Sequence, residues 1–139
     1  TNQPHVAKGT ITEDDVNAAN VFLIKMLLEK GAHIDGVYYC PHHPDKGHEG
    51  ERAQYKIICD CRKPELKMLR EAEKKFNMKI DSKSFIVGDQ TRDIQTGKNA
   101  GCKTILVKTG YGGKDGKFNI KADYEAENLL EAVKTILSS

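Results

Sequence analysis

The sequence predicts an α/β protein built on a three-layer, Rossmann-like parallel sheet with helices on both faces. Short apolar segments at 34–39, 85–88 and 104–107 are predicted strands, and segments with helical periodicity alternate with them. This alternation favours a parallel sheet, because parallel strands need crossover connections that are usually helices. We therefore expect functional side chains at the carboxyl ends of the strands.

The helix boundaries follow from capping residues. The first long helix is expected to begin at Thr12, an N-cap with Asp15 in the reciprocal position of a capping box, and to end near Gly31. The second is expected to begin at Pro64, because proline suits the first helical position. The remaining predicted elements are helices at 91–100 and 128–137, a short strand at 122–124 and a glycine-rich loop at 109–116.

Composition limits the classes of function. The 139 residues include 22 basic and 20 acidic ones, well mixed along the chain, and the formal net charge is +2. No basic stripe with interleaved aromatic residues is present, so nucleic-acid binding is not suggested. No apolar run reaches the ~18 residues that span a bilayer, so no membrane association is expected. We predict a single domain over residues 1–139, with no indication of oligomeric state.

Four zinc-type ligands lie within one 22-residue stretch: Cys40, His42, Cys59 and Cys61. Three thiolates and one imidazole suit a closed tetrahedral zinc site, in which the metal braces a loop and leaves no open position for chemistry. Two disulfides are the alternative, but Cys59 and Cys61 are too close in sequence to pair comfortably with each other. We therefore predict a zinc-binding loop at about 40–62 and, from the reduced thiolates, a cytoplasmic protein. Cys102 is expected to be a small core residue.

Two other positions suggest phosphate chemistry. Asp89 ends the strand at 85–88, and Asp93 follows four residues later. Carboxylates at the carboxyl end of a strand could hold Mg²⁺ against a phosphate, although capping of the next helix is an alternative role for Asp89. Lys63 precedes the predicted helix start at Pro64, where a phosphate could bind, and a solvated lysine is the alternative.

Taken together, these pieces resemble a known enzyme family. Thr1-Asn2-Gln3, Arg62-Lys63-Pro64 and Gly88-Asp89-x-x-x-Asp93 resemble motifs two, three and four of the haloacid-dehalogenase (HAD) superfamily of phosphatases. The run Cys40-Pro41-His42-His43-Pro44, followed by Cys59-Asp60-Cys61, resembles the zinc-containing branch, which acts on heptose bisphosphate or histidinol phosphate. The resemblance runs from Thr1 to about Gly110.

The resemblance implies a Mg²⁺-dependent phosphatase that works through an aspartyl-phosphate intermediate and carries Zn²⁺ at the cysteine–histidine group. Lys63 would neutralise charge on the phosphate, Thr1 would donate its hydroxyl to a phosphoryl oxygen, and Asp89 would bind Mg²⁺. The residues implied to bind a phosphorylated small-molecule substrate are Asn2, Arg62 and Lys8. Heptose 1,7-bisphosphate is favoured over histidinol phosphate by the run Tyr38-Tyr39-Cys40-Pro41-His42-His43-Pro44, which suits it slightly better.

The family's nucleophile motif is missing from this sequence. No Asp-x-Asp-Gly-Thr occurs in the 139 residues. We expect that the strands carrying it lie upstream of Thr1, that the N-terminal strands of the sheet are missing from this chain, and that the chain alone is inactive. A zinc-stapled binding or scaffold fragment is the competing hypothesis. A phospho-acceptor regulatory domain would share the α/β layout but would explain neither the metal ligands nor Lys63-Pro64.

Overall fold

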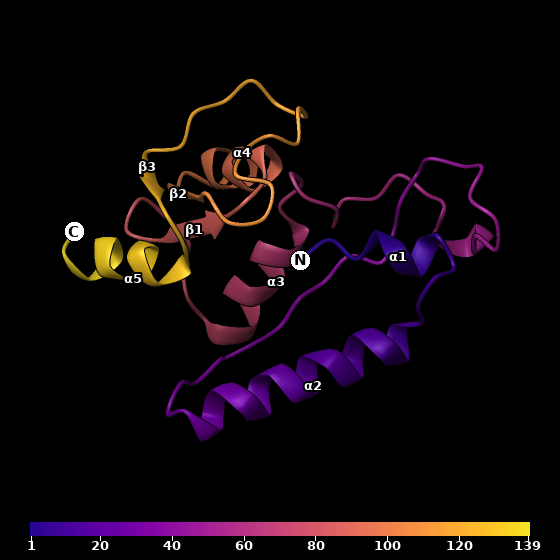
Figure 1. Cartoon of the computed structure of the whole chain (residues 1–139), viewed down its shortest axis with the longest axis horizontal. Coiled ribbons are helices and arrows are strands. Elements are labelled where there is room, and N and C mark those ends of the chain that lie inside the picture. Colours follow the sequence, from indigo (N-terminus) through magenta and orange to yellow (C-terminus); the bar gives the residue numbers. More distant parts are fainter. The chain divides into compact units, whose positions relative to one another are not determined.

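The computed structural model describes residues 1–139, which form two compact units, Thr1–Arg62 and Lys63–Ser139. Figure 1 shows the helices and strands of both units along the chain. None of the helices combines the length and the apolar character needed to cross a membrane.

The first unit is mainly helical and loop-like. It contains α1 (Pro4–Ala7), α2 (Glu13–Glu29) and a 3₁₀ turn, η1 (Ala53–Tyr55). The predicted capping box of α2 is confirmed: Thr12 Oγ1 accepts the Asp15 N–H at 3.0 Å, and the Asp15 carboxylate accepts the Thr12 N–H at 2.7 Å. α1 lies before the first helix predicted from the sequence, and the proline at its first position is typical of helix starts.

The predicted strand at 34–39 is not part of any sheet. The nearest ladder contact is a single parallel bridge between Asn2 and Cys40, in which Cys40 N donates to Thr1 O at 2.9 Å and Gln3 N donates to Cys40 O at 2.7 Å. A strand needs hydrogen-bonding partners along its length, and this segment is bridged only where it ends. Its apolar residues alone therefore led to the wrong assignment.

The second unit contains a three-stranded parallel sheet in the order β1-β2-β3. Its strands are β1 (Phe85–Gly88), β2 (Lys103–Val107) and β3 (Tyr124–Ala126), and its helices are α3 (Lys67–Phe76), α4 (Thr91–Ala100) and α5 (Leu129–Leu137). In register, Phe85 pairs with Lys103 and Ile105 pairs with Tyr124. Figure 1 shows α4 above the strands and α5 below them, so the predicted layered α/β fold is confirmed.

The core of this unit forms where β2 and β3 meet α5. Ile105 and Ala132 are fully buried there, and Val107 and Ala126 are nearly so. Phe85 packs against this cluster from β1. The β-branched residues supply a stiff, apolar surface that suits a central strand, and the sheet thereby holds the carboxyl ends of β1 and β2 side by side.

The start of α3 differs from the prediction. The helix begins at Lys67 with Leu66 as its N-cap, and residues 63–66 form a turn that contains a cis Lys63–Pro64 bond. The N–H groups next to Lys63 are therefore not helix N-terminal donors. The expectation that Lys63 lies at a helix N-terminus was wrong, and any role it has in binding phosphate depends on its own charge.

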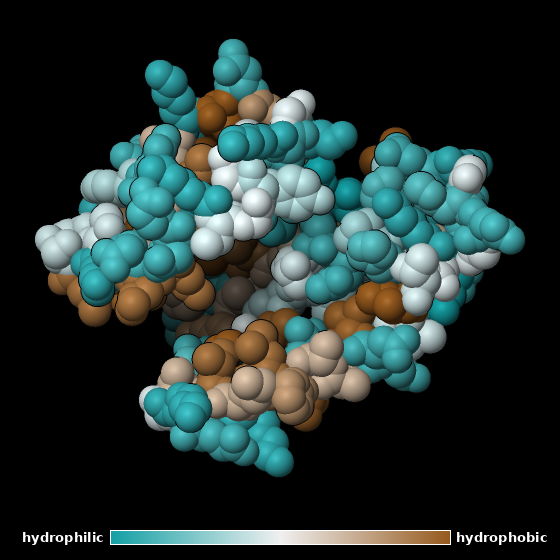
Figure 2. Space-filling view, in the orientation of Figure 1, coloured by the Kyte–Doolittle hydropathy of each residue, from teal (hydrophilic) through white to brown (hydrophobic).

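Both units expose apolar side chains. On α2 these are Val21, Phe22, Leu23, Met26 and Leu28, and on α5 they are Leu129, Leu130, Val133 and Leu137. Figure 2 shows the corresponding hydrophobic surface along each helix. Contiguous apolar surface of this kind is typical of faces that pack against another segment or protein.

Candidate active site and metal centre

The four predicted zinc ligands converge in the first unit. Their ligand atoms, His42 Nδ1 and the three Sγ atoms, all lie within 4.8 Å of one another. Cys61 Sγ is 3.2 Å from Cys40 Sγ and 3.3 Å from Cys59 Sγ, and His42 Nδ1 is 3.3 Å from Cys61 Sγ. A tetrahedral zinc with Zn–S bonds of ~2.3 Å would place its sulfurs about 3.7 Å apart. The cysteines are free thiols, so the group fits zinc and not a pair of disulfides.

Without a metal, the three thiols of the group differ in how readily they ionise. Burial raises the pKa of Cys40, and burial together with the Cys59 hydrogen bond raises that of Cys61. Burial also raises the pKa of Cys59, but the hydrogen bonds with Cys61 and Cys40 outweigh burial, so the pKa of Cys59 is lowered. Two of the three sulfurs therefore resist ionisation by themselves, and a divalent cation would supply the charge that converts them to thiolates.

Side chains around the metal group hold its loop. Glu13, at the start of α2, accepts hydrogen bonds from Tyr55 Oη at 2.6 Å and from Tyr39 Oη at 3.3 Å. The Tyr55 ring lies against the His42 ring, with centroids 6.0 Å apart. Arg62 donates to the His42 carbonyl at 2.9 Å, so this residue, predicted to bind substrate, also supports the loop. No local pattern in the sequence identifies Glu13, because its partners lie 26 and 42 residues away.

Asp89 is held by the glycine-rich loop that follows β2. Its Oδ2 accepts the Tyr111 N–H at 2.9 Å, and its carbonyl accepts the Gly113 N–H at 2.8 Å. Gly110 has φ +66°, and a Cβ there would lie 2.3 Å from Asp89 Oδ2. The loop therefore fixes the orientation of the carboxylate, which does not cap α4. A carboxylate fixed at the end of a parallel strand fits the oxygen-donor preference of Mg²⁺.

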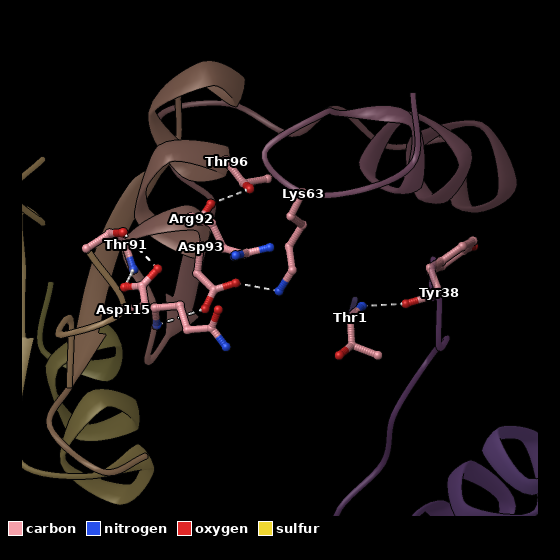
Figure 3. Close-up of polar contacts among 9 residues, drawn as sticks. Thr1, Tyr38, Lys63, Thr91, Arg92, Asp93, Thr96 and Asp115 are labelled. Carbon is pink, nitrogen blue, oxygen red and sulfur yellow. Dashed lines mark hydrogen bonds and ion pairs between the residues drawn. The ribbon is translucent and has the colours of Figure 1, made fainter. Parts of the chain in front are cut away.

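Asp93 pairs with Lys63 at the start of α4. The Asp93 side chain is 7% exposed. Its Oδ1 forms an ion pair with Lys63 Nζ, and its Oδ2 accepts the Gln90 N–H at 3.1 Å. Figure 3 shows this pair beside the first turn of α4. A Cβ at Gly88 would lie 2.3 Å from Asp93 Cβ, so glycine is needed for the close approach. Both oxygens therefore have partners within the protein, and the suggested share of Asp93 in a magnesium site with Asp89 stays a prediction.

Asp115 is a supporting residue that the sequence did not reveal. Its carboxylate accepts the Thr91 N–H at 2.7 Å and the Thr91 hydroxyl at 3.0 Å, and the same hydroxyl accepts the Phe118 N–H at 3.1 Å. These contacts attach the loop that carries Tyr111 to the start of α4 (Figure 3). The capping residue lies 24 residues from the helix it caps, so local patterns cannot identify it.

The other predicted site residues lie in the first unit. The Thr1 backbone nitrogen donates to the Tyr38 carbonyl at 2.6 Å, as Figure 3 shows, and Asn2 takes part in the bridge to Cys40. Lys8 is the C-cap of α1. The structure thus brings together the four metal ligands in one unit and pairs Lys63 with Asp93 in the other. The catalytic role suggested for Thr1 and the substrate-binding roles suggested for Asn2 and Lys8 stay predictions.

Comparison with known proteins places this arrangement in a family. The model of the HAD-hydrolase-like family matches residues 60–132, which is more than half of the chain. The chain belongs to the HAD-like hydrolases. This confirms the family that the sequence motifs suggested, and with it the class of phosphoric monoester hydrolases.

Named relatives of this HAD-like hydrolase share one description. It is 40% identical to D-glycero-beta-D-manno-heptose-1,7-bisphosphate 7-phosphatase of Pasteurella multocida, with 98% of this chain and 71% of the relative covered. It is 36% identical to the D-glycero-D-manno-heptose-1,7-bisphosphate 7-phosphatase of Chlorobaculum tepidum, and the match covers 96% of this chain and 68% of that relative.

A solved structure agrees with these relatives. D,D-heptose 1,7-bisphosphate phosphatase from B. bronchiseptica, complexed with magnesium and phosphate, superposes with a TM-score of 0.79 at 30% identity. The match covers 99% of this HAD-like hydrolase and 72% of that chain. The fold assignment from the sequence is therefore confirmed.

Proposed function

We propose that this HAD-like hydrolase is a Mg²⁺-dependent phosphatase that hydrolyses a phosphate ester of D-glycero-D-manno-heptose 1,7-bisphosphate. The observation that carries the proposal is identity of 36–40%, over nearly the whole chain, to two relatives that bear this activity in their names. The fixed carboxylate of Asp89 and the oriented ammonium of Lys63 agree with it, because phosphoryl transfer is mostly positioning and charge stabilisation.

Each site residue has a distinct proposed role. Asp89 would hold Mg²⁺, which supplies positive charge against the phosphate oxygens. Lys63 would bind the same phosphate, with its ammonium directed by the ion pair with Asp93. Thr1 would donate its hydroxyl to a phosphoryl oxygen. The residues proposed to bind the rest of the substrate are Asn2, Arg62 and Lys8.

The proposal requires an aspartate nucleophile that these residues do not contain in the family's Asp-x-Asp form. That carboxylate would attack phosphorus while the bond from phosphorus to the sugar oxygen breaks. Water would then hydrolyse the aspartyl-phosphate and release inorganic phosphate. We place the nucleophile upstream of Thr1, treat residues 1–139 as part of one HAD-like domain, and place the protein in the cytoplasm, where thiolate ligands stay reduced.

The test compares two proteins and two substrates. One protein is the 139-residue chain, and the other is the product of its complete reading frame. For each protein, phosphate release is measured from heptose 1,7-bisphosphate and from histidinol phosphate. Each measurement is made once with Mg²⁺ and once with EDTA. We expect Mg²⁺-dependent turnover of the heptose substrate by the complete protein and none by the 139-residue chain. Equal rates on both substrates would contradict the substrate assignment. A complete protein that binds zinc but hydrolyses neither would favour the scaffold hypothesis.

A further inference from the structure

Lys56 is a buried lysine to which the proposed chemistry gives no role. Its side chain is 1% exposed, and Nζ lies 3.2 Å from Glu51 Oε2. No acceptor, Glu51 included, meets Nζ with hydrogen-bonding geometry. Buried ion pairs with incomplete hydrogen bonding add little stability, because desolvation offsets the attraction between the charges. The pair is therefore weak evidence for a purely stabilising role.

Glu51 connects Lys56 to the backbone of residues 47–48. Its Oε2 also accepts the Gly47 N–H at 2.9 Å and the His48 N–H at 3.1 Å, and Glu51 N donates to the His48 carbonyl at 3.1 Å. The His48 hydrogen bond lowers the pKa of the Glu51 carboxyl, which keeps it ionised opposite Lys56. One carboxylate thus links Lys56 to the turn formed by residues 47–51.

This turn rests directly on the segment that carries Lys8. Arg52 N donates to the Ala7 carbonyl at 3.0 Å. A Cβ at Gly9 would lie 1.8 Å from the Gly50 carbonyl oxygen, so the two backbones touch. Lys8 lies between these two contact points. The position of its backbone therefore depends on the turn that Glu51 and Lys56 hold.

We propose that Lys56 is a positioning residue for substrate recognition: through Glu51 it fixes residues 47–52, and these fix Lys8. The inference rests on the proposed function, in which Lys8 binds the substrate away from the reacting phosphate. Lys56 itself does not touch the substrate, because its ammonium is buried. Its effect is expected on the binding of a substrate large enough to reach Lys8.

The experiment uses the complete protein with Lys56→Met, a change that keeps the length and removes the charge. We expect the KM for heptose 1,7-bisphosphate to rise about 10-fold with kcat within about 2-fold, which is the pattern of lost binding without lost chemistry. The KM for p-nitrophenyl phosphate should not change, because this small ester presents nothing to Lys8. Hydrogen exchange of the Arg52 amide should become faster.

Two further variants test the same link. Glu51→Gln, which keeps the side-chain shape, should also raise the KM for heptose 1,7-bisphosphate and the Arg52 exchange rate. Lys56→Arg, which keeps the charge, should restore most of the substrate binding.

Lys46→Met is the matched control, since Lys46 is exposed in the same loop. It should leave both KM values, the zinc content and the Arg52 exchange rate unchanged. An unchanged Arg52 exchange rate in Lys56→Met would overturn the positioning role, and so would an equal loss of activity on both substrates together with loss of zinc. If exchange becomes faster but the unmodified protein does not hydrolyse heptose 1,7-bisphosphate, the proposed function fails and so does the link to substrate binding.

Discussion

Lys63 forms an ion pair with Asp93, and the second carboxylate oxygen of Asp93 accepts the Gln90 N–H at the start of α4. One buried carboxylate therefore stabilises a helix end and aims the cation proposed to bind phosphate. The turn at 63–66 contributes no helix N–H groups, so the direction of the Lys63 ammonium depends on its ion pair with Asp93. Stability and activity are coupled at this residue, and two substitutions can separate them.

Asp93→Asn should lower turnover more than it lowers stability. Asparagine can still accept the Gln90 N–H as part of the cap, but it removes the charge that pairs with Lys63. Asp93→Ala should remove both contacts and cost a further ~1 kcal/mol of unfolding free energy, the usual effect of losing a helix cap. Both variants are made in the complete protein. Urea unfolding would measure the change in stability, and Mg²⁺-dependent phosphate release would measure the change in turnover.

Glu71→Gln is the control for these variants, because Glu71 is exposed on α3. It should match the unsubstituted protein in both measurements. Full turnover in Asp93→Asn would contradict the role assigned to the Lys63–Asp93 pair.

The sequence identified elements whose determinants are local. The structure contains the capping box of Thr12 and Asp15 and the short strand before Asp89, each of which is visible within a few residues. It also contains the metal ligands, which appear as two short pairs, Cys40 with His42 and Cys59 with Cys61. Local signals suffice there because the hydrogen bonds or ligand positions are set by nearby backbone.

Long-range contacts account for what the sequence could not predict. Asp115 caps a helix from 24 residues away, and Glu13 joins two tyrosines from distant segments. The segment 34–39 has a strand-like composition but lacks a partner along its length. Pairing, capping and burial of this kind depend on tertiary structure, which composition and periodicity do not specify.

Removal of zinc should loosen the first unit selectively. The purified protein should contain one zinc, and Cys59→Ser should lose it, because each of the four ligands completes the tetrahedral set. Chelation should increase amide exchange within residues 40–61 and lower the melting temperature, since a metal that binds only the folded state stabilises that state. Metal analysis and hydrogen exchange would test this.

Cys102→Ala provides the comparison, because Cys102 is a buried free thiol outside the metal group. It should keep one zinc. Retention of full zinc by Cys59→Ser would show that the metal is held by another set of ligands.

Because of Asp123, the free energy of unfolding should depend on pH between 3.8 and about 2. The Lys98 ion pair and the Thr104 hydrogen bonds lower its pKa from 3.8 to about 2. A depressed pKa in the folded state adds stability that is present above the unfolded value of 3.8 and is lost as the pH falls toward 2. The side chain is 37% exposed, so salt should weaken the effect of Lys98 more than that of Thr104.

Asp123→Asn should therefore destabilise the second unit at pH 6, and its difference from the unsubstituted protein should shrink between pH 4 and about 2. Chemical denaturation across this range, with NMR titration of the Asp123 carboxyl, would measure both quantities. A titration midpoint near 3.8 would contradict the pairing with Lys98 and Thr104.

Gly110→Ala should disturb Asp89, the proposed magnesium ligand, without touching the metal directly. A Cβ at Gly110 would lie 2.3 Å from Asp89 Oδ2, so the carboxylate or the loop must move. Gly116→Ala is the matched control, because Gly116 has a similar φ of +61° but a Cβ there would meet no atom within 4 Å. Both variants should lose ~1 kcal/mol of stability, since alanine is strained in the left-handed region of the backbone.

Only Gly110→Ala should raise the Mg²⁺ concentration needed for half-maximal phosphate release. The expected rise is about 10-fold or more, since displacement of the Asp89 carboxylate should weaken the site by ~1.4 kcal/mol or more. A Mg²⁺ titration of the complete protein and of both variants would measure it. If Gly110→Ala and Gly116→Ala need the same Mg²⁺ concentration for half-maximal phosphate release, the backbone strain common to both variants accounts for the whole effect. The orientation of Asp89 by this loop would then not matter for metal binding.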